Sequence, residues 1–303
     1  MIQLFNINDY VVDTATLGNH LHGKIVDHLV EEVCAYVGAK YGCALNSATN
    51  AIFLAFENKE KTVSIPSILP PVVANAILHG GNRIKFVDEV EWVGHSYVLH
   101  DFRDYKVIDS AQRMDRNQFK ECDGDDLVIF SFYPTKPVGG IDGGIIVSDD
   151  KDKIEYLKQR AMNGMSYSEN NWERVAVSHG WKMYMNSVQA FVAMQNLKKL
   201  DGKKVKLKAI RDFYNKKFGL DNTSNHLYRI NVPNRDQKLA SLKDKYGISC
   251  GVHYRALHKM DPYKHGSFLP KSNAESEHTL SIPFHENLSN DELGRVVECI
   301  SRV

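Results

Sequence analysis

The stretch "DDLVIFSFYPTKPVGGIDGG", residues 125–144, joins an apolar, strand-like run to a lysine that stands between two prolines. Lysine is usually a solvated surface residue, yet Lys136 follows a run that predicts a buried strand. Pro137 disfavours the helical region for Lys136, so we expect an extended loop to present the lysine. The glycines that follow allow a tight turn and a close approach to a ligand. The pattern indicates a reactive lysine at a strand end; a stiff surface turn with an incidental lysine is the alternative.

The composition is that of an ordinary globular protein, with 303 residues, 43% hydrophobic and 25% charged. A net charge of +1 provides no basic field for nucleic acid. No apolar run approaches the roughly 18 residues of a membrane span, and the N-terminus lacks the apolar core of a signal peptide. Five scattered cysteines without a CxxC pair suit a reducing compartment. We therefore expect a soluble cytoplasmic protein without nucleic-acid or membrane partners.

Strand-like and helix-like segments alternate through the first two-thirds of the chain. The expected strands are 43–45, 62–66, 83–88, 105–109, 126–132 and 143–149, and the expected helices between them are 24–42, 46–59 and 72–81. This alternation predicts an α/β fold with a mostly parallel sheet flanked by helices. Sites in such sheets lie at the carboxyl ends of the strands.

The regular alternation of strands and helices ends in the last third of the chain. Residues 184–219 predict a helix, a break near Asp201–Gly202 and a second, basic helix whose charges mainly form a solvated face. An extended stretch "HLYRINV", a helix through "RDQKLASLKDKYG" and a final helix from Asn290 then predict a smaller α+β domain. We expect a large domain over residues 1–205, and a linking helix with a small C-terminal domain over 206–303.

Two further features fall at predicted strand ends. "LNSATNAI" (45–52) is a strand-to-helix turn in which Ser47 or Asn46 is a plausible N-cap, and helix N-termini bind phosphate. "VIDSAQ" (107–112) places Asp109 at a strand end. Simple capping explains each feature when it is taken alone. Together with Lys136 they match pyridoxal phosphate, which needs a phosphate site, a carboxylate at its ring nitrogen and a Schiff-base lysine.

An ordered series of motifs extends this interpretation over nearly the whole chain. The series is "NSATNAI", "SIPSILPPVVANAI", "KFVD", "VIDSAQ", "FSFYPTKPVGGIDGGIIVS", "GWKMYMNSVQAFVAMQNLKKLD", "GISCGVHYRALHKMDPY" and "LPKSNAESEHTLSIPFHENLSNDEL". It resembles the DegT/DnrJ/EryC1/StrS sugar aminotransferases, which are fold-type I pyridoxal-phosphate enzymes. The resemblance implies ping-pong transfer of an amino group from L-glutamate to a nucleotide-linked keto sugar, through a Schiff base on Lys136 and the aminated cofactor. It thus implies a role in polysaccharide biosynthesis.

The resemblance also implies roles for particular residues. The implied cofactor contacts are Lys136 (Schiff base), Asp109 (ring nitrogen), Gln112 (near the 3-hydroxyl), and Ala48, Thr49 and Ser131 (phosphate). The segment "GWKMYMN" matches a stretch that reaches into a neighbouring subunit, which implies a homodimer with shared sites. Lys182 and Tyr184 replace the Asn and Arg of the usual "GxNxR" pattern, so Asn186 or Lys182 could supply the phosphate contact.

Candidate substrate residues are Lys182, Tyr184, His253 and Arg255, of which the last two match an edge of the small domain over the site. They could contact a substrate diphosphate or carboxylate; ordinary structural roles are the alternative. The spacing from Lys136 to Gly143 is closer to that of relatives that aminate C4 than of those that aminate C3.

Three departures from the family pattern stand out. Pro70 occupies the position of an aromatic residue that stacks on the cofactor ring, so either Pro70, Tyr97 or Tyr133 is expected to take that role. The phosphate turn has Ser-Ala-Thr in place of Ser-Gly-Thr. Residues 88–109 are much shorter than the usual strand–helix–strand excursion, which makes this an unusually short member.

Two other functions fit parts of the pattern. Pro70 and the missing excursion would suit a non-catalytic pyridoxal-phosphate-binding or regulatory protein. A sugar dehydratase of the same family would carry His in place of Lys136, so the lysine argues against it. A metal site is not expected. The histidines after residue 250 are not spaced as metal ligands are, and no cysteine cluster accompanies them; they are His253, His258, His265, His278 and His285.

Overall fold

The computed structural model describes residues 1–7, 9–167, 174–264 and 266–302. Its helices are α1 (Lys24–Val37), α2 (Ala48–Phe56), α3 (Pro71–His79), α4 (Lys151–Ala161), α5 (Ser187–Leu197), α6 (Leu200–Phe218), α7 (Arg235–Tyr246), α8 (Pro270–His278) and α9 (Asn290–Arg302). Its strands are β1 (Tyr41–Leu45), β2 (Thr62–Pro66), β3 (Arg83–Val87), β4 (Tyr97–Asp101), β5 (Lys106–Asp109), β6 (Leu127–Ser131), β7 (Gly144–Ser148), β8 (Met165–Tyr167), β9 (Arg174–Ala176), β10 (Tyr228–Asn231) and β11 (Thr279–Ile282).

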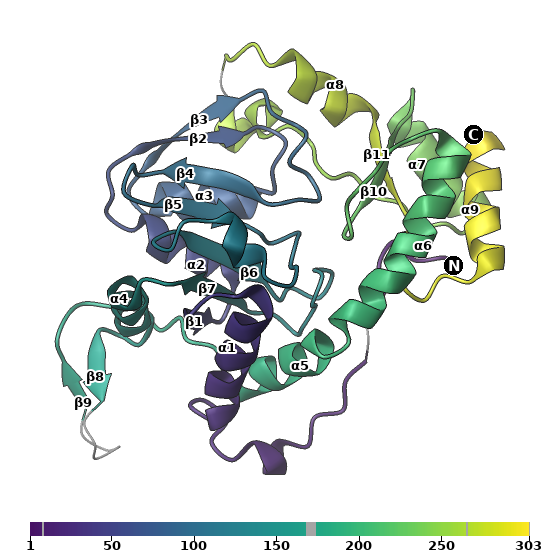
Figure 1. The fold of residues 1–303 in the computed structure, drawn as a ribbon. Helices are drawn as coiled ribbons and strands as arrows, with labels where there is room; N and C mark the ends of the chain where they lie inside the picture. Colours follow the sequence, from purple (N-terminus) through teal and green to yellow (C-terminus); the bar gives the residue numbers. More distant parts are fainter. Residues whose placement is uncertain (8, 168–173, 265, 303) are drawn as a thin grey trace.

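A five-stranded sheet in the order β1-β7-β6-β5-β4 forms the centre of the α/β part (Figure 1). Strands β5 and β6 are parallel, whereas β7 runs antiparallel to both β1 and β6, and β4 runs antiparallel to β5. Strands β2 and β3 form a separate parallel pair. The α/β architecture is as expected, but the sheet is mixed rather than mostly parallel. The direction of a strand depends on how its connection runs, which an apolar pattern does not specify.

Helices cover both faces of this sheet. Along β6, Leu127 and Ile129 join the hydrophobic cluster with α2, α3 and α4, while Val128 and Phe130 join the cluster with α1 and α5. Alternate side chains of a strand point to opposite faces, so an unbroken apolar run is the signature of a strand buried on both sides. The carboxyl end of β6 is therefore packed between helices on both faces of the sheet.

The shortened region before Asp109 forms a β-hairpin. Strand β4 pairs antiparallel with β5 and sets Tyr97 opposite Asp109. Phe102 N donates to Tyr105 O at 2.9 Å in the turn between the strands. Antiparallel strands can be joined by a short turn, whereas parallel strands need a crossover of about a dozen residues or more. Because β4 runs antiparallel to β5, a short turn is enough to connect them, and no long strand–helix–strand connection is needed.

The remainder of the chain packs around a third hydrophobic cluster. Helix α6 extends from α5 toward α7 and α9 (Figure 1), and its Leu207, Ile210 and Tyr214 enter this cluster with residues of β10, β11 and α9. Ile2 of the N-terminal segment also lies there. The division of the chain into domains at residue 205 stays a prediction. Within the described residues, no helix is both long and apolar enough to span a membrane.

Most predicted elements of the first two-thirds are confirmed within a few residues, and so are α7 and α9. The predicted break near Asp201–Gly202 is wrong in position. Helix α5 ends at Leu197 and α6 begins at Leu200, so Gly202 lies in the first turn of α6. A glycine weakens a helix but does not end it when tertiary contacts hold the turn.

Candidate active site

The carboxyl end of β1 leads into the N-terminus of α2. Ser47 is the N-cap, and its Oγ accepts a hydrogen bond from Asn50 N at 3.2 Å. The next two amides, those of Ala48 and Thr49, have no hydrogen-bond acceptor among the described residues. Free amides at a helix start, together with the positive end of the helix dipole, attract anions.

Two neighbouring strands bring Ser131 and Gly144 to this helix start. They face each other across the β6–β7 ladder. A Cβ on Gly144 would lie only 2.5 Å from Ala48 N, so only glycine allows the helix to sit this close. We call Ala48, Thr49, Ser131 and Gly144 the α2 cradle. Its donors are of the kind that can hold a phosphate, and the phosphate site itself stays a prediction.

Asp109 ends β5 and is only 4% exposed. Its Oδ1 accepts from Ala111 N at 2.9 Å, and its Oδ2 accepts from the Tyr97 hydroxyl at 3.1 Å. Burial raises the pKa of this carboxyl, and the two hydrogen bonds and the charge of Lys136 oppose that rise. A carboxylate can accept about four hydrogen bonds, so both oxygens keep capacity for a ligand.

Lys136 lies on the loop that follows β6. Its backbone N–H donates to Tyr133 O at 2.9 Å, so Pro134 occupies the second position of a tight turn rather than an extended loop. Asn196 Nδ2 donates to Gly139 O at 2.7 Å, which ties the loop to α5. Burial lowers the pKa of Lys136 to about 8, although the charge of Asp109 acts in the opposite direction. The result is an amine that is partly neutral near physiological pH.

Three aromatic rings surround the Asp109 end of the site. Trp92 lies 4.5 Å from Tyr97 between ring centroids, and it stacks on Tyr254 at 6.2 Å with an interplanar angle of 5°. The Tyr254 hydroxyl accepts from Gln112 Nε2 at 3.0 Å. We call Trp92, Tyr97 and Tyr254 the aromatic wall. Gln112 is buried and held at this end of the site, and its predicted position near the 3-hydroxyl of the cofactor stays a prediction.

Pro70 and Tyr133, two candidates for stacking on a cofactor ring, lie in different settings. Pro70 is the N-cap residue of α3. Tyr133 is 53% exposed. Tyr97, the third candidate, contacts Trp92 and Asp109 as described above. The residue that stacks on the ring stays a prediction.

The predicted intersubunit residues lie next to the end of β1, where Tyr184 bridges to Leu45 and Met183 O accepts from Asn46 N at 2.8 Å. Asn186 caps α5, and its side-chain oxygen accepts from Gln189 N at 2.9 Å. Tyr184 contacts the ring of His22 at 4.6 Å and lines a cavity of about 420 Å³ beside β1 and α1. Lys182 bridges to Met162 through the backbone. The contact of these three residues with the cofactor of a partner subunit stays a prediction.

The structure separates the two predicted substrate residues of the small domain. His253 lies near Lys136: burial lowers the pKa of its imidazole to about 4, and the charge of Lys136 adds to the effect. Arg255 instead forms an exposed ion pair with Asp236 at 3.0 Å. His226, which no sequence pattern singled out, is buried in the same place, and Lys136 likewise depresses its pKa after burial.

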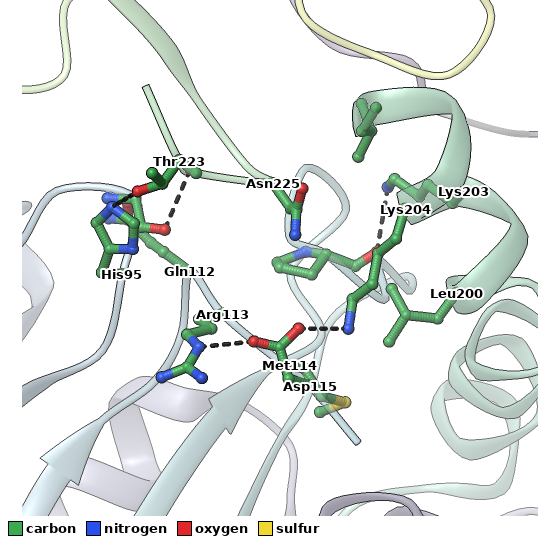
Figure 2. A pocket seen from close by; sticks show the side chains of 14 residues that line it. His95, Gln112, Arg113, Met114, Asp115, Leu200, Lys203, Lys204, Thr223 and Asn225 are labelled. Carbon is green, nitrogen blue, oxygen red and sulfur yellow. Dashed lines mark hydrogen bonds and ion pairs between the residues drawn. The ribbon is translucent and has the colours of Figure 1, made fainter. Parts of the chain in front are cut away.

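A small cavity of about 50 Å³ is lined by Gln112 and by residues of α6 (Figure 2). Figure 2 shows the ion pairs of Asp115 with Arg113 and Lys204 across its floor. Lys203 Nζ donates to the carbonyl of Pro137, the residue after Lys136, at 3.1 Å. Helix α6 therefore holds the Lys136 loop from behind. Among the described residues, no group of His, Cys, Asp and Glu side chains is placed to hold a metal ion.

The residues of this site match the groups of pyridoxal phosphate. The α2 cradle offers amides and a hydroxyl for the phosphate, Asp109 offers a carboxylate with spare capacity, and Lys136 offers an amine of lowered pKa. The cradle is closed by a glycine whose Cβ would collide with the helix. The donor set therefore fits this cofactor.

Comparison with known proteins agrees with this fit. The model of the DegT/DnrJ/EryC1/StrS aminotransferase family matches residues 5–92 and 109–301. The chain belongs to this family. The family model leaves out residues 93–108, which include β4 and the turn to β5. The part of this DegT/DnrJ/EryC1/StrS member that the family model does not match is thus most of its hairpin.

Two relatives illustrate the similarity in sequence. The chain is 28% identical to the UDP-4-amino-4,6-dideoxy-N-acetyl-beta-L-altrosamine transaminase of Campylobacter jejuni subsp. jejuni serotype O:23/36, over 88% of this chain and 86% of the relative. It is 27% identical to the spore coat polysaccharide biosynthesis protein SpsC of Bacillus subtilis, over 96% of this chain and 92% of the relative.

Solved structures show the same fold. Helicobacter pylori PseC, an aminotransferase involved in the biosynthesis of pseudoaminic acid, superposes with a TM-score of 0.80 at 19% identity, over 99% of each chain. NtdA from Bacillus subtilis, solved with bound cofactor PMP, gives a TM-score of 0.81 at 17% identity, over 96% of this chain and 79% of that one. The chain is an aminotransferase with the fold of the sugar aminotransferases.

Proposed function

We propose that this aminotransferase uses pyridoxal phosphate to move the amino group of L-glutamate to a keto sugar linked to a nucleotide. The observation that carries the proposal is Lys136, a buried amine of lowered pKa that is electrostatically coupled to Asp109. The names of the relatives support the substrate class, since one is a transaminase of a UDP-linked amino sugar and another of a dTDP-linked one.

Each residue of the site has a part in this reaction. Bound pyridoxal phosphate would supply an electron sink for the bond that breaks at the substrate carbon. The amides of Ala48 and Thr49 and the hydroxyl of Ser131 would hold the phosphate. Asp109 would keep a proton on the ring nitrogen, because a nearby anion favours the charged form.

Lys136 would act as the proton carrier. Its amine would take the proton from the α-carbon of glutamate, and in the second half-reaction it would deliver a proton to the sugar carbon that receives the nitrogen. A pKa of about 8 suits both directions, because the neutral and the charged amine are then both populated near neutral pH. Because burial lowers the pKa values of His226 and His253, both imidazoles are neutral near pH 7 and add no second positive charge near Lys136.

The proposal includes a homodimer with shared sites. Lys182, Tyr184 and Asn186 lie on the segment that resembles the family's intersubunit stretch, and a cavity of about 420 Å³ opens beside Tyr184. We expect this segment to contact the cofactor of the partner subunit. A measured mass of one chain in solution at working concentration would contradict this part.

The test begins with protein loaded with pyridoxal phosphate. Borohydride reduction followed by peptide mapping should place the cofactor on Lys136, and Lys136→Ala should carry none. Addition of L-glutamate alone should yield one 2-oxoglutarate per site, because the first half-reaction needs no sugar. UDP-linked 4-keto and dTDP-linked 3-keto sugars then identify the acceptor. Cofactor on Lys136 without any 2-oxoglutarate would instead identify a non-catalytic binding protein.

A further inference from the structure

Tyr97 reaches the carboxylate of Asp109 because of the hairpin. The two residues are directly opposite each other on the antiparallel strands β4 and β5. Opposed residues on such strands project their side chains to the same face. The Tyr97 hydroxyl donates to Asp109 Oδ2 at 3.1 Å, where Asp109 is buried and Tyr97 is half-buried.

The aromatic wall fixes the position of Tyr97. Its ring lies 4.5 Å from that of Trp92, and Trp92 Nε1 donates to Ile68 O at 3.0 Å. On the far side of Trp92, Tyr254 is held by Gln112. Since Tyr97 is anchored by its backbone pairing and by Trp92, its hydroxyl has a fixed direction toward Oδ2.

The chemistry of Asp109 gives this contact a purpose. A buried carboxyl tends to become neutral, and a neutral acid would not hold a protonated ring nitrogen. The charged and titratable groups that face Asp109 are Lys136 from the loop after β6, Tyr97 from β4 and Tyr254 from the segment before α8. Of the donors to the carboxylate, Ala111 N binds Oδ1, and only the Tyr97 hydroxyl binds Oδ2 within the described residues.

We propose that Tyr97 is a positioning residue, whose hydroxyl holds Asp109 ionised and directed toward the ring nitrogen of pyridoxal phosphate. The inference rests on the proposed function. It assigns a task to the segment that the family model does not match, since residues 93–108 deliver this hydroxyl. The hairpin takes the place of the family's longer excursion, and it supplies one hydrogen bond to Asp109, the proposed partner of the ring nitrogen.

The experiment compares Tyr97→Phe with Tyr105→Phe. Tyr105 belongs to the same hairpin, and its ring stacks on Phe102 at 5.0 Å, away from Asp109. Tyr97→Phe should bind pyridoxal phosphate about tenfold more weakly, as expected for loss of a hydrogen bond to a charged group. Tyr105→Phe should bind it as wild type does. Equal affinity of both variants and wild type would overturn the inference.

A pH profile and a double-mutant cycle exclude a purely structural role. Without the hydroxyl, the pKa of Asp109 rises further, so the loss of cofactor affinity on acidification should begin at higher pH in Tyr97→Phe. In an Asp109→Asn background, Tyr97→Phe should have no further effect. An equal effect in both backgrounds would show that Tyr97 acts through packing alone. If wild type itself takes up no pyridoxal phosphate, the proposed function fails, and the role of Tyr97 with it.

Discussion

The two ends of the candidate site are built in different ways. The α2 cradle consists of a capped helix start and a glycine from a neighbouring strand, and it offers mainly backbone amides as donors. The aromatic wall consists of large side chains from separate segments, with Tyr254 more than a hundred residues after Trp92. A site made of backbone amides needs small residues, because only they let the backbone come close to a ligand. A wall made of large side chains instead needs distant parts of the chain to pack against one another.

The largest expected effect concerns the wall. Trp92→Ala should lower the free energy of unfolding by about 3–5 kcal/mol, because it removes a large buried ring and its hydrogen bond to Ile68 O. Urea denaturation measures the change. Phe268→Ala is the matched control, since Phe268 is 87% exposed and its truncation should change stability by less than about 0.5 kcal/mol. Similar losses in both variants would refute a packed wall.

An intermediate effect is expected in the cradle. Gly144→Ala should cost about 1–3 kcal/mol of stability, because the new Cβ must displace the start of α2 from a contact of 2.5 Å. It should also weaken pyridoxal-phosphate binding, which a titration of cofactor fluorescence would detect. Gly202→Ala on α6 is the control: nothing lies within 4 Å of its Cβ position, so that change should stabilise the helix by up to about 1 kcal/mol. A Gly144→Ala protein with unchanged cofactor affinity would contradict the cradle.

The smallest expected effect links the two ends through Lys136. Covalent attachment of pyridoxal phosphate requires the neutral amine, so its rate should rise with pH with a midpoint near 8 and level off above it. Asp109→Asn removes the charge that raises the pKa of Lys136, so the midpoint should move to lower pH. Stopped-flow absorbance at several pH values gives both profiles. Asp212→Asn, in an exposed pair with Lys208 on α6, should leave the midpoint in place, and an identical midpoint in Asp109→Asn would refute the coupling.

Local sequence signals account for the parts of the site that were predicted. Lys136, Asp109 and the α2 turn stand at strand ends that apolar runs and glycines mark clearly. Ser47 was one of two predicted N-caps, and the structure selects it. These features are legible because a cap, a strand end and a tight turn each depend on a few adjacent residues.

Other parts depend on distant contacts and could not be predicted in this way. Tyr254 lies between the two predicted residues His253 and Arg255, yet it alone of the three bonds to Gln112. Successive residues of an extended segment point in different directions, and no local pattern states which one faces the site. His226 becomes part of the site only through the packing of its segment near Lys136.

The sequence by itself determined many of the strands and helices, the family, and the three groups that match the cofactor. Its motifs specify these because each is a local arrangement of backbone and nearby side chains. Only the tertiary structure decided that β4 runs antiparallel to β5 and that Tyr97 meets Asp109. The register of a hairpin is fixed by its turn and by burial of one face, so a single-residue slip would turn Tyr97 away from the carboxylate.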